Sequence, residues 1–225
     1  MRARNLAWPP GVLETMEPRN FWAWVIWNTF LAIAPVVLAQ VISRMAGQWK
    51  RTPTLKILAA LLGLGWLALL PNTCYLLTEW RHYLLTLDAD NLYLRSRLDS
   101  NATLWLMIYT AFYFCYSAVG MLAFALAIRP MAQLLKSRGY TAWIWGIPFF
   151  LLMSVGVYLG LILRYNSWDL ITRPSEVWNS VLELTRHPLL VRFIVVFGGF
   201  LWLAYTAIDI WIDGFIGRWK KTAGR

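Results

Sequence analysis

The sequence predicts an all-α protein, a polytopic transmembrane helical bundle of five spans with short interfacial amphipathic helices. The composition is the first observation: 59% of the 225 residues are hydrophobic, only 14% are charged, and the mean hydropathy is +0.51. A soluble domain is about a quarter charged, and a disordered chain is poor in hydrophobic residues and rich in charge. Both classes are therefore excluded. The 15 Trp and 10 Tyr residues suit the two membrane–water interfaces.

Five apolar stretches are the second observation, because each reaches the length of about 20 residues that a helix needs to cross a bilayer. They are residues 21–43, 57–77, 103–128, 141–163 and 189–212. The first, third and fourth are uncharged, and the fourth contains Pro148. The second is interrupted near its end by Pro71. The fifth carries Arg192 and Asp209 near its two ends.

The distribution of Lys and Arg is the third observation, and it predicts the orientation. These residues are densest in the short connections after the first and third spans and in the tail, so the positive-inside rule makes that side cytoplasmic. We expect an extracytoplasmic segment over 1–20, one transmembrane domain over 21–215 and a basic cytoplasmic tail over 216–225. The net charge of +10 then forms mostly a cytoplasmic rim that suits anionic lipid headgroups rather than nucleic acid.

A first polar cluster follows the end of the second span. Pro71 removes a backbone donor and breaks or kinks the helix, and Asn72 can bond to the carbonyls that are freed at this depth. Glu79 and His82 are three residues apart, so they share one helix face. A Glu-x-x-His pair supplies metal ligands in carboxylate-bridged bundles. The alternative for Pro71 is a kink in which every backbone group is hydrogen-bonded. The alternative for Glu79 and His82 is that both side chains face water at the interface.

A second polar cluster follows the fourth span. Arg164 can snorkel to the headgroups, Asn166 or Ser167 can cap a short following helix, and Asp169 then lies in its first turn, where a carboxylate is favoured. Both clusters end even-numbered spans and so leave the membrane on the same face. The sequence therefore predicts one shared polar site at the outer leaflet.

These two clusters resemble the signatures of a bacterial membrane protein family called domain of unknown function 1361. Its members carry a run similar to Leu-Pro-Asn-Ala-Pro-Tyr, then Thr-Asp-x-x-His, and later Tyr-Leu-Gly-Arg-Phe-Leu-Arg-x-Asn-Ser-Trp-Asp. The matching residues here are Pro71, Asn72, Tyr75, Thr78, His82, Tyr158, Gly160, Arg164, Asn166, Ser167, Trp168 and Asp169. Thr73-Cys74, Glu79 and Leu161 depart from the pattern. The resemblance implies a multi-pass protein of the bacterial inner membrane, with the domain over roughly residues 25 to 215, and it implies no activity.

Three function classes remain open. The first, narrowly favoured, is a non-catalytic membrane assembly or partner protein in which the motifs hold the bundle together. The second is an enzyme that acts on a lipid-linked or headgroup substrate, and the third is a small-solute or proton-coupled transporter that uses the broken second helix. The expected partners are the bilayer, lipid headgroups or another membrane protein, and not nucleic acid.

The enzyme hypothesis gives roles to particular residues. Glu79 or Asp169 would act as the general base, and His82 as a base or a metal ligand. Arg164 would clamp a phosphate, with Asn72 and Asn166 completing the substrate-binding set. No cofactor motif is evident in the sequence, and a divalent metal at Glu79 and His82 is the one cofactor hypothesis.

Two further expectations concern the rest of the chain. Residues 175–186 have an apolar side and predict an amphipathic helix in the outer interface, and 84–98 is a candidate for a second one. Asp209 and Asp213 are four residues apart near the cytoplasmic end, and we expect them to pair with Arg218 or with water.

Overall fold

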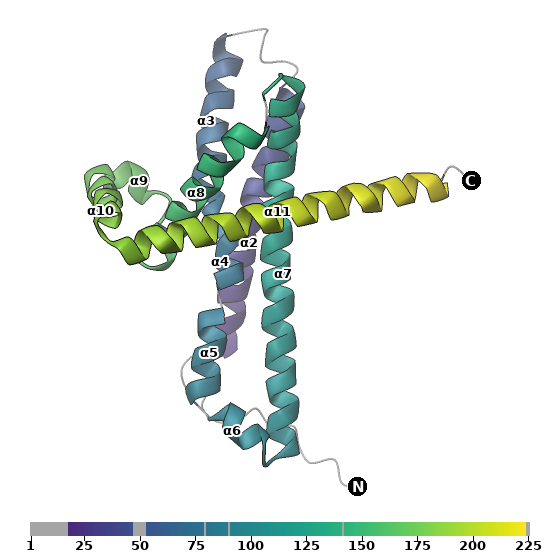
Figure 1. Ribbon diagram of the computed structural model, residues 1–225, viewed down its shortest axis with the longest axis vertical. Coiled ribbons are helices and arrows are strands. Elements are labelled where there is room, and N and C mark those ends of the chain that lie inside the picture. The colour runs from purple at the N-terminus through teal and green to yellow at the C-terminus, as the bar shows by residue number, and fades with distance from the viewer. Residues whose placement is uncertain (1–17, 47–52, 79, 90, 141, 224–225) are drawn as a thin grey trace.

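The computed structural model describes residues 18–46, 53–78, 80–89, 91–140 and 142–223. Within these ranges every regular element is a helix, which confirms the all-α class (Figure 1). The helices are α2 (Pro18–Met45), α3 (Pro53–Leu69), α4 (Pro71–Thr78), α5 (Trp80–Ala89), α6 (Leu92–Ser96), α7 (Ser100–Ser137), α8 (Ala142–Leu161), α9 (Asp169–Thr172), α10 (Pro174–Arg186) and α11 (Pro188–Ala223).

Four helical segments are long and apolar enough to cross a membrane. They are Trp22–Met45, Pro53–Leu85, Ser100–Ser137 and Pro188–Ala223, which contain most of the first, second, third and fifth predicted spans. The fourth predicted span coincides with α8, and the described apolar segment in it, Gly146–Leu161, is shorter than the usual spanning length. The structure therefore supports a multi-pass membrane protein with four candidate spans, and a fifth span remains a prediction.

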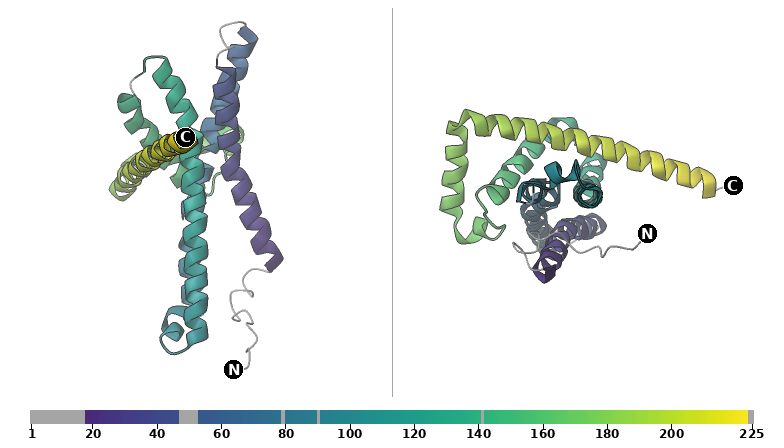
Figure 2. Two further views of the ribbon diagram at one scale, coloured as in Figure 1. Left: turned by 90° about the vertical axis from the view of Figure 1, so that its right-hand side faces the viewer. Right: turned by 90° about the horizontal axis from the view of Figure 1, so that it is seen from below.

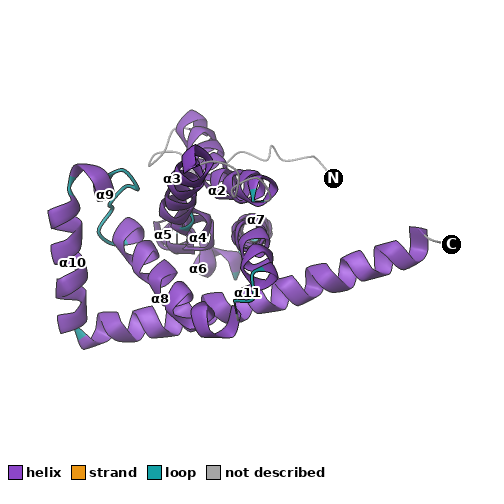
Figure 3. Ribbon diagram, turned by 90° about the horizontal axis from the view of Figure 1, so that it is seen from above, coloured by secondary structure: helices purple, strands orange, loops and turns teal. Residues whose placement is uncertain are grey.

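The long helices do not all run in one direction. Helices α2, α3 and α7 lie along the long axis of the molecule, whereas α8 slants and α11 crosses the other helices (Figures 1 and 2). Helix α11 packs mainly along α8. At Gly198 of α11 an added Cβ would lie 3.2 Å from the carbonyl oxygen of Phe150, so a larger residue would require its neighbours to move by a few tenths of an ångström. Seen from above, α9, α10 and α11 follow one another around α8 (Figure 3).

The core lies where these helices meet. Ile42 of α2, Leu70 after α3, Phe124 of α7, Met153 of α8 and Leu201 of α11 belong to one cluster and are almost fully buried. The side chains on the outer faces include many exposed large apolar residues. An apolar exterior of this kind is what a lipid-facing surface requires.

Two local predictions agree with the structure. The second predicted span breaks where Pro71 begins a new helix after Leu69, and an amphipathic helix covers residues 175–186, within α10. The candidate helix over 84–98 corresponds to α5 and α6. These elements bring the two polar clusters into the positions described next.

Candidate functional site

Helix α4 carries the first motif, and glycines of α8 pack directly against it. A Cβ added at Gly156 would lie 2.6 Å from Cγ of Pro71, and one at Gly160 would lie 1.4 Å from the hydroxyl oxygen of Tyr75. Small residues let helices approach closely in membranes. Pro71, Tyr75 and Gly160 all belong to the two family-like motifs, so the motifs contact each other.

Helix α7 approaches α4 in the same way from another side. A Cβ added at Gly120 would lie 2.6 Å from Cβ of Leu76 and 2.9 Å from the carbonyl oxygen of Thr73. The hydroxyl of Ser117 donates to the carbonyl oxygen of Leu76 at 3.3 Å. Helix α4 is therefore held between α7 and α8, and Thr73 and Leu76 are fully buried.

The carbonyl groups at the break find partners from both motifs. The carbonyl oxygen of Leu70 accepts from the backbone N–H of Thr73 at 3.1 Å and from its hydroxyl at 2.8 Å. The carbonyl oxygen of Ala68 accepts from the hydroxyl of Ser167 at 2.9 Å, across 99 positions of sequence. Carbonyls freed by a proline at membrane depth need such partners. We call this arrangement the α4 joint: Ala68, Pro71, Thr73, Tyr75, Gly156, Gly160 and Ser167.

Asp169 is buried and bonded within its own segment. One carboxylate oxygen accepts from the backbone N–H of Asn166 at 2.7 Å, and the other accepts from the Thr172 hydroxyl at 3.3 Å and lies 3.8 Å from Nε of Arg173. The sequence correctly placed Asp169 in the first turn of a short helix, but it predicted a cap supplied by Asn166 or Ser167. Trp168 is the N-cap residue of α9 and its side chain makes no cap bond, while the Ser167 hydroxyl donates to the α4 joint.

Arg164 and Asn166 lie on the exposed side of this segment. Arg164 has a φ of 59°, the left-handed conformation in which a residue ending a helix is usually Gly or Asn. Its backbone reverses the chain after α8, and the Tyr165 N–H bonds to the carbonyl oxygen of Leu159 at 3.0 Å. Both side chains are thus available at the surface.

The residues of the first polar cluster do not share one environment in the structure. Asn72 is buried in α4. His82 of α5 packs edge to face on Trp24 of α2, with ring centroids 5.5 Å apart. Glu79 lies outside the described residues, so its pairing with His82 as metal ligands remains a prediction. Among the described residues, no group of three His, Cys, Asp or Glu side chains could hold a metal ion.

The structure therefore brings together only part of the predicted set. Asn166, in the loop after α8, bonds to Asp169 at the start of α9, and Ser167 links that loop to the end of α3, next to the helix that holds Asn72. His82 belongs to α5, which Figure 1 shows well apart from α9. One site that includes both His82 and Asp169 remains a prediction.

The sequence interpretation missed a charged cluster between α7 and α11. The Arg129 guanidinium forms ion pairs with both Asp209 and Asp213 and donates to the Asp209 carbonyl oxygen at 3.2 Å. The sequence interpretation expected Arg218 or water as the partner of these acids, and the cation that the structure places beside them is Arg129 instead of Arg218. The i, i+4 spacing put both carboxylates on one helix face, but the sequence does not say which helix that face meets.

Comparisons with known proteins identify a family and no activity. No curated protein and no solved structure matches this chain. The family described as protein of unknown function (DUF1361) matches residues 27–204, which include both motifs. Since this match covers most of the chain, the protein belongs to the DUF1361 family.

Proposed function

We propose that this DUF1361 protein is a non-catalytic assembly or partner protein of the bacterial inner membrane. It crosses the membrane five times, with residues 21–215 as its transmembrane domain, the amino-terminal segment 1–20 outside and the tail 216–225 in the cytoplasm. The denser Lys and Arg in the connections of one side support this orientation. The two motifs stabilise the fold rather than perform chemistry.

The pairing of the motif side chains carries this proposal. Ser167 and Thr73 donate to backbone carbonyls of the α4 joint, and the carboxylate of Asp169 accepts from its own loop. A catalytic group has to reach the proton or atom of the substrate on which it acts, whereas these side chains are directed at groups of the protein itself. Ser167 and Thr73, bonded in this way, stabilise the break in the second span, and Asp169 stabilises the start of α9.

A second candidate is an enzyme that acts on a lipid-linked or headgroup substrate. The exposure of Arg164 and Asn166 beside the buried Asp169 favours it, because an exposed guanidinium can clamp a phosphate and a buried carboxylate can act as a base. Glu79 and His82 would complete the set as base or metal ligands.

Incubation of the purified full-length chain in vesicles of bacterial lipids distinguishes the two candidates. We expect lipid mass spectrometry to show no change in headgroup composition, and mild detergent extracts of the native membrane to contain the chain in a stoichiometric complex with a second protein. Consumption of a lipid by the wild type that Arg164→Ala or Asp169→Asn abolishes would overturn the proposal. Bound divalent metal that is lost in His82→Ala would point to the metal-dependent enzyme.

A further inference from the structure

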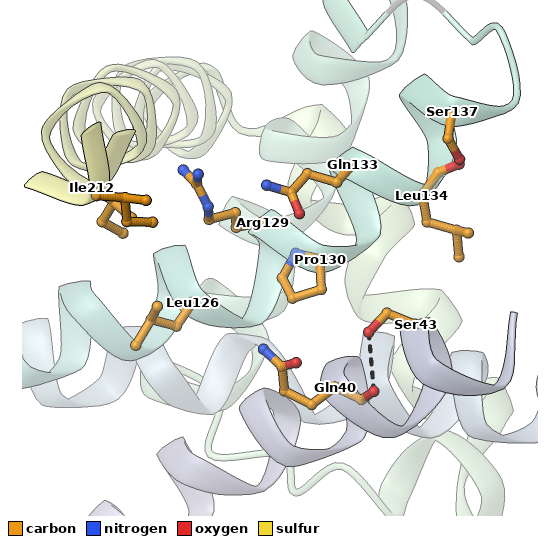
Figure 4. A pocket seen from close by; sticks show the side chains of 10 residues that line it. Gln40, Ser43, Leu126, Arg129, Pro130, Gln133, Leu134, Ser137 and Ile212 are labelled. Carbon is orange, nitrogen blue, oxygen red and sulfur yellow. Dashed lines mark hydrogen bonds between the residues drawn. The ribbon is translucent and has the colours of Figure 1, made fainter. Parts of the chain in front are cut away.

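A groove of about 470 Å³ lies between α2, α7 and α11, away from the two motifs (Figure 4). Its volume falls within the roughly 300–1,000 Å³ of ligand sites in proteins. It is lined by Gln40, Ser43, Leu126, Arg129, Pro130, Gln133, Leu134, Ser137, Ile212 and Ile216. None of these residues belongs to the family-like motifs.

The lining is divided between polar and apolar chemistry. Amide and hydroxyl groups come from α2 and α7, and Gln133 extends toward the Arg129 guanidinium (Figure 4). Apolar surface comes from side chains such as Leu126 of α7 and Ile212 of α11. A ligand that satisfies both is amphiphilic, with a hydrogen-bonding head and a hydrocarbon part.

The charges beside the groove determine which kind of polar head an amphiphilic ligand needs. Arg129 lines the groove and supplies one positive charge, and its ion-pair partners Asp209 and Asp213, which lie outside the lining, supply two negative charges beside it. The Asp213 side chain is 67% exposed, so its carboxylate can accept further hydrogen bonds. A head with only negative charge would meet a net negative cluster, whereas a head with an ammonium group and a phosphate finds acceptors and donors together.

The position of the groove at the ends of two helices suits a lipid head. Gln40 and Ser43 lie in the last turns of α2, and Gln133 and Ser137 in the last turns of α7. These helix ends belong to the side that is rich in Lys and Arg, including Arg44 and Lys136. Under the proposed orientation this is the headgroup region of the cytoplasmic leaflet.

We propose that the groove binds one zwitterionic aminophospholipid. Its ammonium group donates to the Asp213 carboxylate beside the groove, and its phosphate accepts from the Gln133 amide. The first carbons of its acyl chains lie against the apolar lining, and the rest of each chain stays in the bilayer. This ligand is independent of the α4 joint and of the proposed partner role.

Native mass spectrometry of the full-length, delipidated chain in detergent tests the proposal. The probes are phosphatidylethanolamine, phosphatidylcholine, which lacks N–H donors, and the anionic phosphatidylglycerol, all with the same acyl chains. We expect one phosphatidylethanolamine to bind about tenfold more tightly than either other lipid, the effect of losing one charge-assisted hydrogen bond.

Two variants locate the binding, and one serves as a control. Gln133→Leu keeps a side chain of similar size at an exposed position and removes the amide, and Asp213→Asn removes the charge that receives the ammonium group. Gln133→Leu removes a contact to the phosphate that all three lipids share and should weaken the binding of all three, whereas Asp213→Asn should lose the preference for phosphatidylethanolamine. Asn101→Leu makes a comparable amide-to-apolar change at the exposed start of α7 and should retain it.

Three results would overturn the proposal. Equal binding of all three lipids to the wild type would show a non-selective lipid surface. Tighter binding of phosphatidylglycerol would show an anion site, against the charge argument. A preference for phosphatidylethanolamine that survives in Asp213→Asn, or lipid binding that is unchanged in Gln133→Leu, would place the lipid elsewhere. Circular dichroism of each variant shows that its helices remain folded.

Discussion

At the scale of single residues, Ser167 shows where local interpretation of the sequence reaches its limit. Its place after α8 favoured a helix cap, yet its hydroxyl bonds to the carbonyl oxygen of Ala68, 99 positions away. The break at Pro71 indicated that carbonyls would be freed. Which side chain would reach them depends on how α8 packs against α4, and a single sequence does not contain that packing.

Arg164 provides a prediction about backbone strain. A left-handed conformation costs an L-residue about 1 kcal/mol or more, and glycine avoids this cost. Because Arg164 has a φ of 59°, we expect Arg164→Gly to be about 1 kcal/mol more stable than Arg164→Ala, measured by thermal unfolding of the detergent-solubilised chain. An alanine variant at least as stable as the glycine variant would contradict this backbone conformation.

At the scale of elements, the α4 joint explains why the two motifs occur in one chain. The sequence predicted the broken helix from Pro71 alone, and it predicted that both clusters leave the membrane on one face. It did not predict that Gly156 and Gly160 receive the side chains of Pro71 and Tyr75. Glycine in an apolar helix has many uses, and only the neighbouring helix shows which one applies.

Gly160→Ala tests this contact. The added methyl group would overlap the Tyr75 hydroxyl, and overpacking of this kind costs about 1–3 kcal/mol. Gly146→Ala, on the same helix with nothing within 4 Å of the added Cβ, should be neutral or slightly stabilising. Thermal unfolding compares the two variants, and Tyr75→Leu should restore part of the loss. Equal stability of both alanine variants would contradict the close packing.

The ion pairs between α7 and α11 provide a second prediction at this scale. Arg129→Gln leaves Asp209 and Asp213 without their shared cation. Breaking a fully buried pair costs about 3–5 kcal/mol, and because both carboxylates are exposed to solvent in part we expect a smaller loss, about 1 kcal/mol.

Two comparisons check this ion pair by the unfolding midpoint. Asp209→Asn in the Arg129→Gln background should recover part of the stability, because fewer like charges remain together. Lys136→Gln removes one exposed positive charge from the same helix and should change stability by less than about 0.5 kcal/mol. A loss for Arg129→Gln no larger than that of Lys136→Gln would contradict the role of the ion pair.

At the scale of the whole molecule, composition and the length of apolar stretches were sufficient to predict an all-α membrane protein. Four candidate spans are present in the structure, and the match of the DUF1361 family to residues 27–204 confirms the predicted family. The sequence did not predict that α11 crosses the other helices (Figure 2). The direction of a helix depends on its contacts with neighbouring helices, such as that of Gly198 with Phe150. The apolar composition of a helix does not indicate this direction, because it is the same at every tilt angle.

The orientation of the chain can be measured by cysteine labelling in intact cells, with Cys74 and Cys115 replaced by Ala. Leu98, which is 93% exposed between α6 and α7, belongs to the proposed outer side, and Lys136 to the cytoplasmic side. A membrane-impermeant maleimide should label Leu98→Cys in intact cells, and Lys136→Cys only after the membrane is opened. The opposite pattern would invert the orientation.

The α4 joint as a structural unit is tested most directly by the unfolding midpoint of Ser167→Ala in the full-length chain. Removing the hydroxyl leaves the Ala68 carbonyl oxygen without the bond that Ser167 donates, a loss of about 1–3 kcal/mol. We expect the midpoint to fall by several degrees, and Ser175→Ala, on the exposed face of α10, to leave it unchanged. An unchanged midpoint for Ser167→Ala would contradict the structural role of the motifs.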